Sequence, residues 1–241
     1  MNEHNNAPRL VNWAGYLAIT FVLLLPVSVL TVRSGAWQQG LGLYALACLG
    51  ATLVMVVCIT LLLLPRFAVW RKNLLQRGLI ALPGTLLLLS LTAGGDYPLI
   101  HDITTDTADP PTFTMAQEFR GEGSNTLDVD PETISAQVEA YPELKTLHSS
   151  LSIDDAFTRA LDVAARLGWN IYHQDRNTGV IEAVETTRIM GFKDDIVIRV
   201  RGNANGALLD LRSVSRVGEG DIGANAKRIR AFYQAFEVQG E

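Results

Sequence analysis

Beyond about residue 94 the sequence contains no cysteine, because Cys48 and Cys58 both lie in its apolar N-terminal part. This absence excludes a thiol nucleophile, a thiolate metal site and an internal disulfide from the polar part of the chain. A P-loop, a glycine-rich dinucleotide fingerprint, an HExxH zinc motif and a nucleophile elbow are also missing. We therefore expect no cofactor. The sequence favours a function other than catalysis, with an enzyme of unknown type as an alternative.

Charged residues are missing from three long runs near the N-terminus. Residues 10–32 and 40–64 are uncharged and long enough to cross a bilayer, and residues 78–94 are uncharged and at the lower limit of length. We expect a membrane domain over residues 1–94 that contains three transmembrane helices, and a re-entrant segment is the alternative for the third. Because the first run is too long for a signal-peptide core, we do not expect it to be cleaved.

The positions of lysine and arginine predict the orientation. The segment between the second and third runs, PRFAVWRKNLLQR, has four basic residues and no acid, whereas the preceding connection has only Arg33. Loops of this kind remain in the cytoplasm. The predicted location is therefore the bacterial inner membrane, with a cytoplasmic N-terminus and a periplasmic C-terminal domain. Because no ionisable residue falls within the runs, a channel or transporter is not expected.

Basic residues are also scarce in the segment 95–150, which carries many acids and only Arg120 and Lys145 as bases. Prolines interrupt it, GEGSN predicts a loop, and scattered apolar residues are available to pack. We expect an extended acidic strap laid over the domain that follows, with a short helix near residues 131–140. His101, Asp102 and Asp106 are a weak candidate for a hard-cation site. Side-chain turns are the alternative, and we assign no metal.

Residues 151–241 have the pattern of a soluble α+β domain. Ser152 and Asp155 form a capping box before an apolar helical stripe, and Gly168 is a suitable helix end. Strands are predicted at 169–174, 180–188, 195–201 and 208–216, followed by a helix from about 221 to 236 whose apolar stripe includes Ile222. Short turns, such as the one at Asn205-Gly206, make the sheet antiparallel. The expected fold is a four-stranded sheet flanked by helices, in the order helix-β-β-β-β-helix.

Alternation in the last two strands places arginines on one face of the sheet. Ile196, Ile198 and Val200 fall on one face, with Leu209 and Leu211 opposite them. The other face carries Val197 and a ladder of charged residues, namely Arg199, Arg201, Asp210, Arg212 and Arg216. The final helix adds polar residues along one side. Guanidinium groups near a helix N-terminus are suited to binding an anion.

These residues support two interpretations. The first is a candidate anion site made of Arg199, Arg212, Arg216, Asn225 and Arg228. The second is a set of structural ion pairs with the carboxylates Asp194, Asp195, Asp210 and Asp221, which would hold the final helix on the sheet. In the second interpretation we expect Arg212 to pair with Asp221 or Asp195.

Five segments of the polar part resemble one known family. They are HDITTDTADPPTF, YPELKTL, GWNIYHQDRNTGVIEAVETT, FKDDIVIRVR and LDLRSVSRVGEGDIGANAKRIRAF. Together, over about residues 98–236, they resemble the bacterial and plant family described as domain of unknown function 1499. The resemblance implies no reaction, cofactor or partner. Some members of that family have membrane segments ahead of the domain, in agreement with the layout expected here.

The expected function is that of a membrane-anchored binding or interaction module. Its partners would be the lipid bilayer and either an anionic small ligand or other membrane proteins. A structural or assembly subunit of a membrane complex is the alternative. The first 93 residues carry a net charge of +5, so the remainder carries −10 of the total of −5. Such an acidic domain is not expected to bind nucleic acid.

Overall fold

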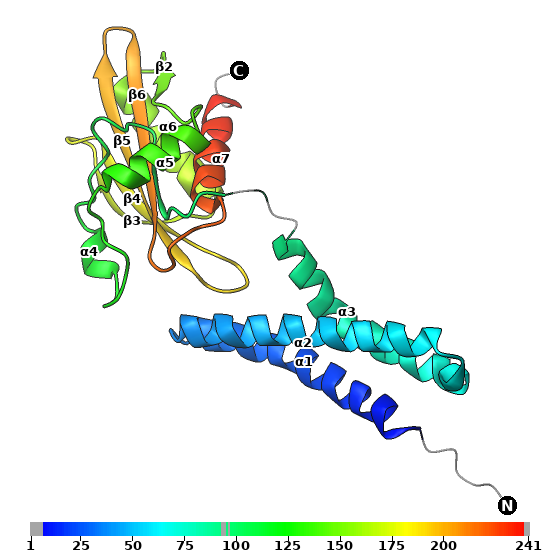
Figure 1. Ribbon diagram of the computed structural model, residues 1–241. Helices are drawn as coiled ribbons and strands as arrows, with labels where there is room; N and C mark the ends of the chain where they lie inside the picture. The colour runs from blue at the N-terminus through cyan, green and yellow to red at the C-terminus, as the bar shows by residue number, and fades with distance from the viewer. Residues whose placement is uncertain (1–6, 93–94, 96, 239–241) are drawn as a thin grey trace, which may run out of the picture. The chain divides into compact units, whose positions relative to one another are not determined.

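The computed structural model describes residues 7–92, 95 and 97–238 of the chain. They form two compact units (Figure 1). The first unit contains three long helices, and the second is a domain built from an antiparallel sheet, helices and long connections. The α+β class expected for the second unit is confirmed.

The helical unit consists of α1 (Arg9–Arg33), α2 (Trp37–Leu63) and α3 (Arg71–Thr92), with a short 3-10 helix, η1 (Pro65–Trp70), before α3. Three helical segments are long and apolar enough to cross a membrane: Arg9–Arg33, Trp37–Leu63 and Pro65–Leu91. The third helix begins earlier than the uncharged run at residue 78 suggested. Its first two turns are polar, and an uncharged run cannot reveal such turns.

Small residues allow the three helices to approach closely. Ala47 and Ala51 are buried on α2, as expected for a pair of small residues spaced by one turn. A Cβ atom added to Gly84 of α3 would lie 2.6 Å from the Cβ of Ala51. A Cβ added to Gly50 would lie 2.3 Å from the ring of Phe21. These contacts leave many large aliphatic side chains exposed on the outside of the unit, as suits helices surrounded by lipid.

The sheet of the second unit has six strands, two more than predicted. These are β1 (Asp102–Thr104), β2 (Leu147–Ser149), β3 (Asn170–Asp175), β4 (Val180–Thr186), β5 (Lys193–Asn203) and β6 (Gly206–Ser215). They are arranged in the order β1-β6-β5-β4-β3, with β2 also paired to β6, and every pair is antiparallel. The two additional strands come from the acidic segment. With three residues each, they are too short to show the alternation from which strands are predicted.

The outer edge of β6 is covered by the acidic segment along most of its length. Strand β2 pairs with residues 207–209 and β1 with residues 212–214. Between them, Thr105 donates its N–H to the carbonyl of Leu211 and accepts the Leu211 N–H on its hydroxyl, both at 2.9 Å. The side-chain amide of Gln137 in turn bonds both backbone groups of Thr104. The backbone groups of these edge residues are thereby satisfied.

Four helices accompany the sheet: α4 (Ala116–Phe119), α5 (Pro131–Ala140), α6 (Ile153–Arg166) and α7 (Ala224–Val238). The short helix expected at 131–140 is present as α5. Ser152 begins α6 by accepting the N–H of Asp155 at 3.1 Å, and Gly168 ends it with a φ of +81°. Both predicted signals of this helix are therefore confirmed.

The start of α7 differs from the prediction. Asp221 accepts the N–H groups of Gly223 and Asn225, so it caps a helix that begins at Ala224. Ile222 lies before the helix in a left-handed conformation, with a φ of +52°, and its side chain is exposed. Its predicted place in the buried stripe was wrong, because the helix begins at Ala224, about one turn inside the segment that the periodicity indicated.

Helices α6 and α7 pack against each other and against β6, on one face of the sheet (Figure 1). The core between them contains Phe157, Val163, Ile181, Ile196, Ile198, Leu209, Leu211, Ile229 and Phe232. Val197 and Val214 are fully buried but lie on the opposite face. The strap contacts that second face through Pro111, Thr114 and Leu127, which creates a third layer.

Candidate functional site

The sheet face beneath the strap is charged and yet buried. Glu182, Asp195 and Asp210 are fully buried, and Arg212 is only 1% exposed. A charge removed from water is costly unless it is paired and hydrogen-bonded. The contacts of each group therefore decide whether this face is a binding site or a structural one.

Arg212 is held by the strap. Its Nη2 lies 2.6 Å and its Nε 3.0 Å from the carboxylate of Asp102, and Nη2 also donates to the carbonyl of Leu127 at 2.8 Å. Its partner is therefore Asp102, and the expected pairing with Asp221 or Asp195 is wrong. The prediction missed this contact because Asp102 belongs to β1, a strand that the sequence did not reveal.

Asp195 lies between two arginines. Arg216 binds it with two parallel hydrogen bonds of 2.7 and 2.9 Å, and Arg120 reaches it from the strap. Burial lowers the pKa of Arg120, and the charge of Asp195 opposes that shift. Arg120 was absent from the predicted site, although it is one of only two bases in the acidic segment. The position of this single arginine among many acids was the signal from which its structural role could have been predicted.

A second cluster joins the far end of the arginine ladder to the strap. Arg201 lies 2.6 Å from Asp210 and 3.0 Å from Asp106, and Arg199 lies 2.9 Å from Asp109 and 3.1 Å from Asp106. Burial alone would raise the pKa of Asp106. Hydrogen bonds from the N–H of Asp109 and from Arg201 outweigh it and lower the pKa.

Two of the three candidate metal ligands bind other partners: Asp102 binds Arg212, and Asp106 binds Arg199 and Arg201. The backbone carbonyl of the third, His101, accepts hydrogen bonds from the N–H of Ser215 and the side-chain amide of Asn225. Within residues 7–92, 95 and 97–238, no group of His, Cys, Asp and Glu side chains is arranged to hold a metal ion.

A further buried carboxylate, Glu182, was missed by sequence reasoning. It accepts the backbone N–H groups of Thr114, Met115 and Ala116 at the start of α4. It lies on the same face as the arginines because it pairs with Val197. Glu182 stands between the apolar residues Ile181 and Ala183 in β4, and this alternation was the signal that this face is polar. Its contacts hold the middle of the strap to the sheet.

Asn225 and Arg228 lie on the other face of the sheet, under α7. Arg228 donates to Asp194, Glu185, Asn225 and the hydroxyl of Ser213. Because α7 packs on the apolar face, these two residues do not meet the arginines under the strap. The sheet separates the five residues of the candidate anion site, which therefore do not form one pocket.

The start of α7 brings another carboxylate close to this second network. Asp221 accepts the N–H of Asn225 at 2.5 Å and that of Gly223 at 2.9 Å. Burial raises the pKa of Asp221, and the charge of Asp194 acts in the same direction. The two N–H donors and Arg228 oppose the shift.

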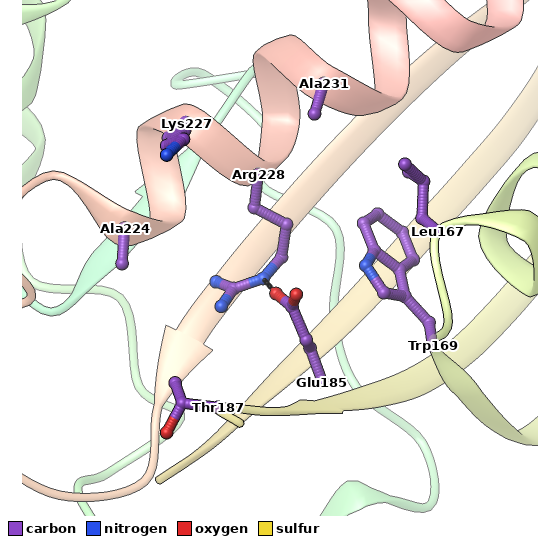
Figure 2. A pocket seen from close by; sticks show the side chains of 8 residues that line it. All are labelled: Leu167, Trp169, Glu185, Thr187, Ala224, Lys227, Arg228 and Ala231. Carbon is purple, nitrogen blue, oxygen red and sulfur yellow. Dashed lines mark hydrogen bonds and ion pairs between the residues drawn. The ribbon is translucent and has the colours of Figure 1, made fainter. Parts of the chain in front are cut away.

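A cavity of about 280 Å³ opens beside this network (Figure 2). Glu185 and Thr187 from the end of β4 lie across from Lys227 and Arg228 on α7, and the remaining walls are Leu167, Trp169, Ala224 and Ala231. Trp169 is stacked on Phe232, with ring centroids 5.5 Å apart, so this wall is rigid. The Glu185 side chain is 35% exposed, and one of its oxygens is bound to Arg228.

The helices and the domain together define a class: a membrane-associated protein in which apolar helices precede an α+β domain with a buried charged face. Residues 102–236 match the family model described as "Protein of unknown function (DUF1499)". The chain belongs to this family, which confirms the resemblance seen in the sequence. The match begins at β1, so it includes the strap as well as the four predicted strands. No curated protein matches the chain.

Replacing Arg212 with alanine is expected to lower the free energy of unfolding of the domain by about 3–5 kcal/mol, because Asp102 would remain buried without its partner. Asp102→Asn should destabilise in the same direction. The measurement is urea denaturation of the detergent-solubilised protein, followed by the fluorescence of Trp169 after the other tryptophans are replaced by phenylalanine.

The matched control is Arg230→Ala. Arg230 pairs with Glu143, and both side chains are about half exposed, so the loss should remain below about 1 kcal/mol. An Arg212→Ala variant as stable as this control would show that the arginine ladder is not structural.

The raised pKa of Asp221 predicts how stability depends on pH. The folded state binds the proton of this carboxyl more tightly than the unfolded state does, so its contribution is lost as the pH rises above about 4. Asp221→Asn cannot titrate, and its stability relative to the parent should improve between pH 4 and 7. Asp175→Asn is the control. Because the N–H of Asn177 lowers the pKa of Asp175, the contribution of that carboxylate is lost only as the pH falls below about 4, and the stability of this variant relative to the parent should stay level between pH 4 and 7. Parallel slopes for the two variants over this range would contradict the assignment.

Proposed function

We propose that this protein is a multi-pass protein of the bacterial inner membrane whose α+β domain is a binding module in the periplasm. The three apolar helices support the membrane location. The orientation is supported by the four basic residues of the loop between the second and third helices, against Arg33 alone in the first loop.

The observation that supports a ligand site is the cavity between β4 and α7. Arg228 is engaged by Asp194, Glu185, Ser213 and Asn225, so its donors are not available to a ligand. The second oxygen of Glu185 accepts no hydrogen bond from the described residues, and Lys227 forms no ion pair with them. The cavity therefore offers one carboxylate oxygen and one ammonium group.

Opposite charges on an apolar cavity favour a small zwitterion. Its cationic group would pair with Glu185 and its anionic group with Lys227, while a short apolar portion would contact Trp169 and Leu167. A volume of about 280 Å³ is near the lower end for small-molecule sites. It accommodates a headgroup-sized molecule, either free or as part of a lipid.

The arginine face supports an anion site less well. Arg199, Arg212 and Arg216 each bind at least one carboxylate at 3.1 Å or less, and the strap covers them. An anion would have to displace both the strap and these carboxylates. Binding of a ligand in the cavity requires neither displacement.

The proposed orientation is tested with reporter fusions. A reporter that is active only in the periplasm should be active when fused after Glu241, and inactive when fused after Lys72. The opposite pattern would place the domain in the cytoplasm and refute the proposal.

The proposed ligand class is tested by calorimetric titration of the solubilised protein with phosphoethanolamine. Ethyl phosphate and ethylamine, which carry only one of the two charges, should bind more weakly. Glu185→Gln and Lys227→Ala should each reduce the affinity for phosphoethanolamine by about tenfold, since one ion pair of about 1.4 kcal/mol is lost.

Lys193→Ala provides the control, because Lys193 is an exposed lysine outside the cavity lining. Equal affinity in all three variants would exclude the cavity as the binding site. Titration with a short-chain phosphatidylethanolamine distinguishes a lipid source from a free small molecule.

A further inference from the structure

We propose that one end of the α+β domain rests on the lipid bilayer and inserts Leu99 and Ile222 into the lipid surface. This apolar end consists of residues 97–100 and the β6–α7 connection at 216–223. The inference concerns a surface and a partner, and it holds whether or not the cavity takes a ligand.

Hydrogen bonds within the domain bring the two segments to the same end of the sheet. Asp221 donates its N–H to the carbonyl of Ile100 at 3.2 Å, and Arg216 donates its N–H to the carbonyl of Lys193, at the start of β5, at 3.0 Å. A Cβ atom on Gly220 would lie 3.2 Å from the Leu99 side chain, so Leu99 lies directly against the connection before α7.

Large aliphatic side chains at this end are exposed to an unusual degree. Leu99 is 80% exposed and Ile222 65%. Single exposed apolar residues are common, but a concentration of them at one end marks a contact surface. The opposite end of the sheet is different. The β3–β4 turn there presents the exposed polar residues Arg176, Asn177 and Thr178.

The chain itself identifies the bilayer as the occupant. Helix α3, which is apolar enough to cross a membrane, ends at Thr92. Leu99 follows seven residues later, so even a fully extended chain holds it within about 25 Å of the helix end. Tyr97 is also partly exposed, and aromatic residues of this kind favour the interface between lipid and water.

Charged residues at this end are compatible with headgroups. Lys193 and Lys227 are exposed there, and lysine side chains reach toward lipid phosphates while their stems cover apolar surface. Glu219 is the exposed acid of the same end. The partner is thus a membrane surface that contains anionic lipid.

The experiment measures the depth of spin labels in the full-length protein. Cys48 and Cys58 are replaced by alanine, and single cysteines are introduced as Leu99→Cys and Ile222→Cys. Each labelled protein is placed in nanodiscs of phosphatidylethanolamine and phosphatidylglycerol. For each label, the rate of collision with oxygen, which concentrates in lipid, is compared with the rate of collision with a water-soluble nickel chelate.

We expect the ratio of collisions with oxygen to collisions with the nickel chelate to be several times higher at both labels than at a label on Thr178→Cys. Nickel accessibility at both positions equal to that at Thr178 would overturn the proposal. Dipolar broadening between labels on different molecules would also overturn it, because a second copy of the chain would then cover this end. A double variant, Leu99→Ser with Ile222→Ser, labelled at a cysteine that replaces Tyr97, should show reduced oxygen accessibility. Unchanged accessibility there would argue against insertion.

Discussion

The buried guanidinium of Arg212 requires a carboxylate, and the architecture of the domain depends on where that carboxylate comes from. Asp102, its partner, lies 110 residues earlier in the chain. To supply it, the acidic segment has to return to the sheet as β1 and then cross the charged face. Along the way it contributes Asp106 and Asp109 to the arginines, and Arg120 to Asp195. The segment is therefore a layer of the fold, and the net negative charge of the strap compensates the arginine face.

This use of charge limits where a ligand can bind. On the strap face, Asp102, Asp195 and Arg212 are bound to opposite charges and shielded from solvent, so they are poor partners for a small molecule. On the helix face, Asp194 is bound to Arg228, which leaves it unsuited to act as a general base. Glu185 and Lys227 are the groups at the cavity that retain capacity for an outside partner. The groups that could bind a ligand thus lie on the apolar side of the sheet.

The sequence allowed much of the domain to be predicted, because local signals specify local structure. The capping box at Ser152, the four longer strands and the sorting of Arg199 and Arg212 onto one face all follow from spacing over a few residues. The three-residue strands β1 and β2 could not be predicted in this way. Because Asp102 lies in β1, the partner of Arg212 could not be predicted either. The separation of Arg228 from the arginine ladder could have been inferred, because a helix that covers the apolar face of the sheet cannot place its side chains on the charged face.

The covered edge of β6 has a consequence for how neighbouring molecules meet. A tethered domain moves in two dimensions and encounters other copies at a high effective concentration. An open strand edge would then favour pairing between sheets and, eventually, aggregation. In this domain β1, Thr105 and β2 occupy that edge of β6. At the other side of the sheet, β3 carries an irregularity in register between Ile171 and His173, which disfavours addition of another strand. The acidic segment thus occupies the edge of β6 through which the sheets of two copies could otherwise pair.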